Sequence, residues 1–231
     1  MANLEPLIQS IPVAPLKLAS LEGCRTLADQ VNNYLVSFRH ESPTNVGQAD
    51  SLQGYCADSY LLECECPRFG SGEGKGVLKE SVRGCDLFIM VDVTNYSLTY
   101  RVNGYENHMS PDNHYQDLKR IISAADGKAR RINVIMPFLY EGRQHKRSKR
   151  ESLDCALMLQ ELVDMGVSNI LTFDAHDPRV SNSIPLHGFD SFMPTYQFLK
   201  ALVNSVPDFV IDNDHLMIIS PDEGAMGRAV Y

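Results

Sequence analysis

The sequence predicts an α/β protein, a three-layer sandwich with a mostly parallel sheet. Three stretches predict strands: DLFIMVD from Asp86, RINVIMP from Arg131 and NILTFD from Asn169. The first is too apolar to have a solvated face, as is typical of a buried parallel strand, and the second is again of the buried kind. Apolar residues at helical spacing fill the segments 113–126 and 152–165, which separate these strands. Strands that alternate with such helices pair in parallel through right-handed crossovers. We therefore expect ligands at the carboxyl ends of the strands.

The amino-terminal part of the chain predicts the rest of this sheet. Residues 16–20 indicate a short strand, residues 23–38 a helix with apolar residues on one face, and residues 60–66 a further strand. The segment 96–111 interrupts a unit with polar and aromatic residues that have no clear period. We expect an inserted loop or hairpin there.

The carboxyl-terminal part predicts the start of a second domain. Residues 216–220 (LMIIS) indicate a buried strand, residues 222–224 a turn, and a helix is expected to begin at Ala225. A buried strand with barely two helical turns after it cannot cover its own faces. We therefore assign residues 1–205 to an amino-terminal domain and residues 206–231 to the start of a truncated second domain.

Charge and apolar content exclude several classes of protein. The 231 residues include 21 Lys and Arg against 29 Asp and Glu, which gives a net charge of −8. This is the wrong sign for a protein that binds nucleic acid or anionic lipid over its whole surface. No apolar run approaches the ~20 residues that cross a bilayer, and the start lacks the features of a signal peptide. We expect a cytoplasmic protein that meets neither nucleic acid nor membrane.

A glycine-rich stretch runs from Arg68 to Gly76 and looks like a phosphate loop. A Walker loop would need Gly where the chain has Phe69, and Ser or Thr where it has Gly76. The dinucleotide pattern G-x-G-x-x-G also fails in every register. The spacing alone favours a flexible surface turn.

A basic stretch, 140–150, follows the strand RINVIMP directly. Its positive residues are Arg143, Lys146, Arg147, Lys149 and Arg150. A charge run is usually a solvated face. The position after a buried parallel strand nevertheless favours contact with a polyanion, because arginine forks fit phosphate oxygens.

Two acidic stretches also follow predicted strands. Asp174 and His176 can both face the cleft at a strand end, and together they suit a divalent metal or a proton relay. A helix-capping Asp and a surface His are an equal alternative. In the stretch 220–228, a turn and an N-cap would explain Asp222 completely.

Taken in order, these stretches resemble one family, ribose-phosphate pyrophosphokinase (phosphoribosyl pyrophosphate synthetase). The resemblance runs from about Leu16 to Tyr231, apart from the 96–111 insert. Several motifs in the right order are far more specific than any one of them. The family's motifs are similar to residues 68–73 (R-F-x-D-G-E), 79–89 (N-E-S-V-R-G-x-D-x-F-I), 142–145 (A-R-Q-D), 173–176 (V-D-L-H) and 220–228 (S-P-D-x-G-x-x-x-R).

The resemblance implies a phosphoribosyltransferase-like fold and a specific reaction. Such enzymes transfer the β,γ-diphosphoryl group of Mg-ATP to the 1-hydroxyl of ribose 5-phosphate and release AMP. They form dimers stacked into hexamers, which implies a homo-oligomer whose ATP site is shared between subunits. The ATP-binding residues implied are Phe69, Ser71 and Glu73 for a neighbouring subunit's site, and Arg143 and Gln144 for the chain's own. The residues implied for Mg²⁺ are Asp174, His176 and Asp222.

Departures from the family pattern limit what the resemblance implies. Ser71 stands for the motif's Asp, His145 for the Asp of A-R-Q-D, and Ala175 for the Leu of V-D-L-H. Nothing in the chain is similar to the loop with the family's catalytic lysine and arginine, or to the D-D-x-x-x-T-G-G-T loop that holds the 5-phosphate. We therefore identify no catalytic residue and expect an incomplete, inactive portion of a synthetase. The alternative is a non-catalytic nucleotide-binding regulatory paralogue, which Ser71 and His145 favour.

Overall fold

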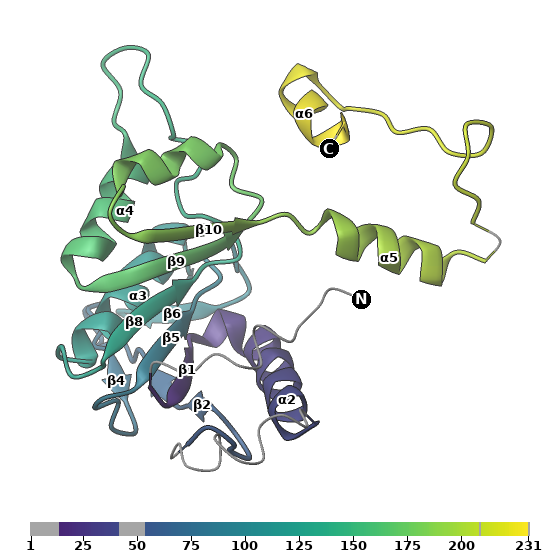
Figure 1. Cartoon of the computed structure of the whole chain (residues 1–231). Helices are drawn as coiled ribbons and strands as arrows, with labels where there is room; N and C mark the ends of the chain where they lie inside the picture. The colour runs from purple at the N-terminus through teal and green to yellow at the C-terminus, as the bar shows by residue number, and fades with distance from the viewer. Residues whose placement is uncertain (1–13, 42–53, 208, 231) are drawn as a thin grey trace. The chain divides into compact units, whose positions relative to one another are not determined.

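The computed structural model describes residues 14–41, 54–207 and 209–230, which form two compact units divided between Phe192 and Met193 (Figure 1). The first unit confirms the predicted parallel sheet. Six strands lie in the order β10-β9-β8-β5-β1-β2, and every neighbouring pair is parallel. They are β1 (Leu16–Ser20), β2 (Leu61–Leu62), β5 (Asp86–Met90), β8 (Arg131–Ile135), β9 (Val167–Phe173) and β10 (Gly188–Phe192).

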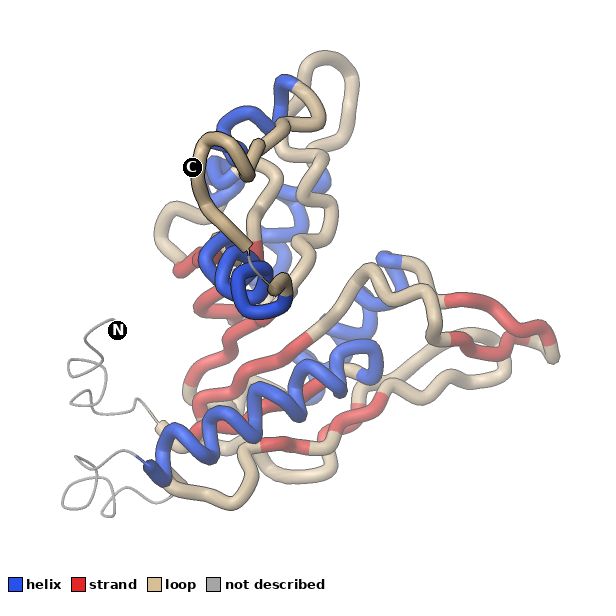
Figure 2. Tube along the Cα trace, turned by 90° about the vertical axis from the view of Figure 1, so that its right-hand side faces the viewer, coloured by secondary structure: helices blue, strands red, loops and turns tan. Residues whose placement is uncertain are grey.

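Helices cover both faces of this sheet, which confirms the three-layer sandwich. Alternate residues of β5 point to opposite faces. Leu87 and Ile89 belong to the core cluster that includes α3 (Pro111–Ala124) and α4 (Asp154–Asp164). Met90 packs in the second cluster with α2 (Arg25–Glu41), which Figure 2 shows lying along one face of the strands. Among the described residues, no helix is both long and apolar enough to cross a membrane.

The path of the chain creates a switch point between β1 and β5. After β1 the chain adds β2 on one side, and it then passes to β5 on the other side and continues outward to β8, β9 and β10. The carboxyl ends of β1 and β5 are therefore where the direction of strand order reverses. In open α/β sheets this is a usual place for ligands.

The prediction of one strand over 60–66 is wrong, because the chain divides its pairing there. β2 stays in the main sheet, whereas β3 (Cys64–Glu65) pairs antiparallel with β4 (Val77–Leu78). Between them, the Glu63 carbonyl accepts a hydrogen bond from the Lys79 N–H at 3.0 Å. The backbone of residues 63–65 thus forms its hydrogen bonds with residues 77–79 and not with β1.

The inserted segment 96–111, expected to be a loop or a hairpin, contains a β-hairpin. β6 (Thr99–Val102) and β7 (Tyr105–His108) are antiparallel, with Asn103 and Gly104 between them at φ +50° and +87°. Positive φ at both positions is the requirement of a tight two-residue hairpin turn. Figure 2 shows this pair of strands projecting from the rest of the unit, at the right of the view.

The second unit contains α5 (Thr195–Ser205), a short 3₁₀ turn η4 (Glu223–Ala225) and α6 (Met226–Val230). The helix expected from Ala225 is therefore present, but the strand expected over 216–220 is wrong. Those residues have no regular secondary structure, and Ile219 is 76% exposed. A strand needs a neighbour for its backbone N–H and C=O groups, and the described residues of this unit offer none. The domain boundary between residues 205 and 206 stays a prediction.

Candidate functional site

The loop after β8 and the loop after β9 meet at the carboxyl edge of the sheet. The rings of His145 and His176 lie 5.0 Å apart between centroids, tilted by 54°. His145 Nε2 is 3.6 Å from Asp177 Oδ2, and both side chains are largely buried. The structure thus joins the basic stretch 140–150 to the Asp174–His176 pair, as the parallel order of β8 and β9 requires.

Two successive turns shape the loop after β8. The N–H of Gly142 donates to the Leu139 carbonyl at 3.0 Å, and the N–H of Gln144 donates to the Glu141 carbonyl at 2.8 Å. Leu139 is buried in the core and anchors the loop. Arg143 and Gln144, two predicted ATP-binding residues, consequently lie exposed on the surface, where an anionic ligand can reach them.

Tyr140 ties this loop to α3. Its hydroxyl donates to Asp112 Oδ1 at 2.6 Å, and its ring stacks on Tyr115 with 4.6 Å between centroids. Burial, together with the Asp112 carboxylate, raises the pKa of Tyr140. Burial also raises the pKa of Glu141, helped by the carboxylates of Asp154 and Asp112. The base of the loop is therefore held by the neutral phenol of Tyr140, which lies near the carboxyl groups of Asp112, Glu141 and Asp154.

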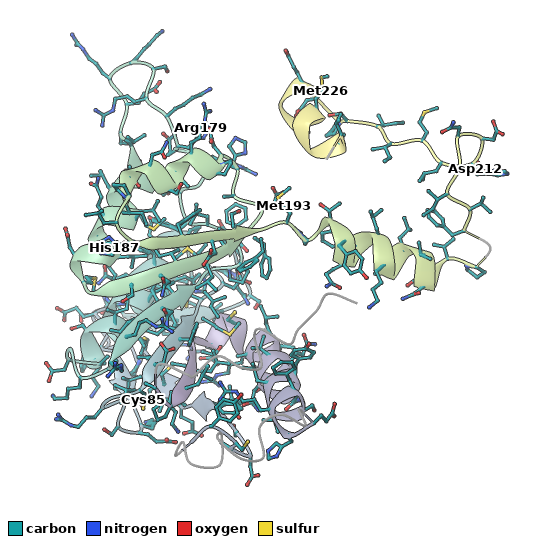
Figure 3. All side chains as sticks on the ribbon, viewed as in Figure 1. Cys85, Arg179, His187, Met193, Asp212 and Met226 are labelled. Carbon is teal, nitrogen blue, oxygen red and sulfur yellow. The ribbon has the colours of Figure 1, made fainter. Side chains whose placement is uncertain are left out.

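Asp177 is an ionised partner for His145. Its carboxylate receives three hydrogen bonds from the Arg179 guanidinium, at 2.9, 3.1 and 2.5 Å, and one from the Arg179 backbone N–H at 2.9 Å. The Arg179 contacts hold the pKa of Asp177 well below its usual range. Figure 3 shows Arg179 on the 3₁₀ segment η3 (Pro178–Ser183) that follows β9. A negative charge thus faces the imidazole of His145 at neutral pH.

The backbone presents Asp174 and His176 on either side of a buried residue. Ala175 is buried, and its N–H donates to Ser191 Oγ at 2.9 Å. The N–H of Asp174 donates to the Phe192 carbonyl at 2.9 Å, and Asp174 itself has φ +42°. The two neighbours of Ala175 lie just beyond the end of β9. Asp174 is half-buried there, and His176 is exposed.

The glycine-rich stretch forms a closed turn. The N–H of Phe69 donates to the Glu73 carbonyl at 2.7 Å, and Gly72 closes back on the Phe69 carbonyl at 2.9 Å. Gly72 has φ +92°, which favours glycine. The Phe69 ring is 54% exposed, and Ser71 Oγ donates to Glu73 at 2.8 Å. Phe69, Ser71 and Glu73, the three residues predicted to bind ATP in a neighbouring subunit's site, thus share one small turn.

Charged side chains attach this turn to α3. The Arg68 guanidinium binds the Asp117 carboxylate with two hydrogen bonds, at 2.6 and 2.8 Å. Arg120 donates to the same carboxylate at 2.6 Å. The Phe69 turn therefore contacts α3, whereas the Arg143 loop follows β8. No contact between the two loops is found among the described residues.

Asp222, the third predicted metal ligand, lies in the second unit. Its side chain accepts a hydrogen bond from the Ala225 N–H at 2.9 Å and caps η4. This is the capping geometry that the sequence offered as the alternative explanation. Within the part of the chain that the structure describes, no group of three or more His, Cys, Asp or Glu side chains could hold a metal ion.

His145 and Asp177 are site residues that sequence reasoning missed. His145 was visible only as a departure from the family's A-R-Q-D motif, and Asp177 as the residue after the D-x-H pattern. The signal that could have joined them is the parallel pairing of β8 with β9, where Ile135 is opposite Leu171. Loops that follow paired strands at matching ends must lie close together.

The chain is an α/β protein with an open parallel sheet, and a basic loop and an Asp-x-His loop lie at neighbouring strand ends. Ligands of such sheets bind at these strand ends. Residues 16–166 match the model of the N-terminal domain of ribose phosphate pyrophosphokinase, and the chain belongs to this family. The solved phosphoribosylpyrophosphate synthetase of Mycobacterium smegmatis has a similar fold, with a TM-score of 0.62 and 21% identity over 82% of this chain and 52% of that chain.

Curated relatives named ribose-phosphate pyrophosphokinase agree with this family. The protein of Corynebacterium ammoniagenes is 27% identical over 220 residues, which are 93% of this chain and 55% of that protein. The protein of Staphylococcus epidermidis is 28% identical over 173 residues, 73% of this chain and 48% of that protein. The chain thus spans about half the length of the curated relatives it matches.

Proposed function

We propose that this chain supplies the ATP-binding part of a ribose-phosphate pyrophosphokinase. In that reaction the β,γ-diphosphoryl group of ATP passes to the 1-hydroxyl of ribose 5-phosphate, and AMP leaves. The observation that carries the proposal is the meeting of two family motifs, residues 142–145 and 173–176, through the contact of His145 with His176. One nucleotide could reach both loops.

The proposed nucleotide contacts follow from the chemistry of each side chain. Arg143 binds phosphate oxygens through its guanidinium fork, and Gln144 hydrogen-bonds the nucleotide beside it. Phe69 stacks on the adenine, with Ser71 and Glu73 next to it. The exposed Phe69 ring supports a role toward a second molecule of the chain. We therefore propose a homo-oligomer, from dimer to hexamer, in which the site is shared.

Magnesium is the proposed metal. Mg²⁺ is usually held by one or two carboxylates, with substrate phosphates and water completing its six ligands. Asp174 and His176 are the proposed protein ligands in the first unit, because few protein ligands are needed. Bound magnesium would neutralise charge on the phosphates. The protein itself would orient the phosphates of ATP. Arg143 would bind them, and His145 holds the loop of Arg143 against the loop after β9.

Catalysis by the 231 residues alone is not part of the proposal. No segment is similar to the family's 5-phosphate loop, so the 1-hydroxyl would not be held in line with the β-phosphorus. Good positioning is worth about 7–11 kcal/mol of barrier. We propose that this chain makes no phosphoribosyl pyrophosphate by itself, and that it acts in the cytoplasm.

Calorimetric titration with a non-hydrolysable ATP analogue and magnesium tests the nucleotide site. Arg143→Ala removes a charge-assisted phosphate contact of about 1.5–3 kcal/mol, so affinity should fall about ten- to hundredfold. Arg130→Ala is the matched control, because Arg130 is exposed and precedes β8, at the opposite end of that strand. Equal affinities of the two variants in an oligomeric preparation would refute the site.

A further inference from the structure

A cavity of about 530 Å³ lies at the switch point of the sheet. Its walls include Leu21 and Glu22, which follow β1, and Leu98 and Arg101, which belong to the segment after β5. Residues 142–145 and 173–176 do not line it. Both its place and its size are those of small-molecule sites, which typically measure about 300–1,000 Å³. Of the family motifs, only the stretch 68–73 reaches it, through Arg68.

The inserted hairpin forms one wall of this cavity. The Asn103 N–H donates to the Gly70 carbonyl at 3.1 Å, and the Met109 N–H closes the base of the hairpin on the Leu98 carbonyl at 2.9 Å. The Arg68 guanidinium lies 5.3 Å from the centroid of the Tyr100 ring. The hairpin is thereby held against the Phe69 turn, and the segment absent from the family pattern shapes the cavity.

The charged side chains that line the cavity are three arginines and three carboxylates. Arg25, Arg68 and Arg101 line it, together with Glu22, Glu65 and Asp117. Asp117 also binds Arg120, and Glu65 is paired with Lys79 at 2.5 Å. Glu22 lies 3.9 Å from Arg25, and Asp117 also binds Arg68. Each lining carboxylate therefore has a cationic partner, whereas Arg101 forms no ion pair among the described residues. A cationic side chain without such a partner attracts anions.

The remaining wall is apolar and aromatic. Leu21, Leu98 and Met109 line the cavity with the Tyr100 ring, and Cys64 and Cys66 add two thiols. Burial raises the pKa of Cys64 to about 11 and that of Cys66 to about 12, so both thiols stay neutral. A ligand that fits both parts of the wall carries an anionic group on an apolar body.

We propose that this cavity binds a small organic anion, a phosphate or carboxylate on an apolar or aromatic body. Arg101 and Arg25 contact the anionic group, because both are exposed and line the cavity. The body packs on Tyr100 and Met109. The site uses none of the residues after β8 and β9, and it adjoins the Phe69 turn of the proposed nucleotide site through Arg68.

Protection of a cysteine from alkylation tests this site. The probe is phenyl phosphate, and the rate of Cys66 alkylation at about pH 9 is followed by peptide mass spectrometry. Phenyl phosphate should slow alkylation of Cys66 at least about fivefold at saturation, leaving the exposed Cys56 unchanged as an internal control. An unchanged Cys66 rate at millimolar phenyl phosphate would overturn the proposal.

Two other probes separate the parts of the ligand. Benzyl alcohol, which has the ring without the charge, should not protect Cys66, and equal protection would overturn the anion requirement. Inorganic phosphate should protect more weakly than phenyl phosphate, and equal protection would overturn the apolar requirement.

Variants locate the bound anion. Arg101→Gln should raise about tenfold the phenyl phosphate concentration that half-protects Cys66 from alkylation. Arg130→Gln and Arg143→Gln should leave that concentration unchanged. Circular dichroism verifies that each variant is folded. A loss with Arg143→Gln and none with Arg101→Gln would place the anion at the loop after β8 and overturn the cavity site. Because Arg143 is tested separately, failure here leaves the proposed nucleotide site standing.

Discussion

Asp117→Ala should destabilise the first unit and release the Phe69 turn from α3. The side chains of Arg68 and Asp117 are only 9% and 6% exposed, and Arg120 shares the same carboxylate. Removing the carboxylate leaves Arg68 as a buried charge without its partner. Breaking a buried pair from one side costs about 3–5 kcal/mol. For a chain of this size each kcal/mol lowers the melting temperature by about 2–4 °C.

Thermal and urea unfolding, followed by circular dichroism, measure this loss. We expect Asp117→Ala to melt about 6–20 °C below the parent chain. Asp126→Asn is the control, because Asn tolerates the positive φ of Asp126 and loss of its exposed pair with Lys128 should not move the transition. If Asp117→Ala costs less than about 1 kcal/mol, the buried cluster does not hold the turn and the reasoning is refuted.

The remaining predictions concern the loops after β8 and β9. His145→Ala should weaken binding of a magnesium–ATP analogue at least about threefold by calorimetry, whereas His187→Ala, before β10 at the opposite end of the sheet, should not (Figure 3). Arg179 lowers the pKa of Asp177 in the folded protein. The Asp177–Arg179 pair therefore contributes its full stability at pH values above the unfolded pKa of Asp, about 3.9. This stability is lost as the pH falls through the folded pKa. Asp177→Asn should therefore make the melting temperature fall less steeply at acid pH. The same fall in both proteins would show that the Asp177–Arg179 pair does not stabilise the fold. His176→Ala and Asp174→Asn should be non-additive in magnesium–nucleotide affinity, and additive losses would show that the two side chains act separately.

The strands of the main sheet were predictable because their signals are local. The mostly apolar stretches 86–90 and 131–135 predicted buried strands, and helical spacing identified the segments that cover them. The Asn103-Gly104 turn carried an equally local hairpin signal. The short pairing of β3 with β4 could not be predicted, because two-residue strands leave almost no pattern.

The strand expected over 216–220 shows the limit of such reasoning. Its apolar run was real, but a run becomes a strand only when another strand pairs with it, and the sequence does not say which partner is present. The same limit applies to the site. Arg143 and His176 were found from motifs, whereas the contact of His145 with Asp177 depends on which strands are neighbours.

The central claim is that the chain supplies nucleotide binding for diphosphoryl transfer but holds no ribose 5-phosphate in line. AMP release by the purified chain, measured with ATP, magnesium, phosphate and ribose 5-phosphate, tests it most directly. A longer polypeptide, extended through any downstream reading frame, serves as the comparison. We predict no ribose-dependent AMP from the chain, although calorimetry detects the ATP analogue, and release from a longer polypeptide that carries a 5-phosphate loop. Ribose-dependent AMP release by the 231 residues alone would contradict the claim, and an inactive extended chain would favour a regulatory paralogue.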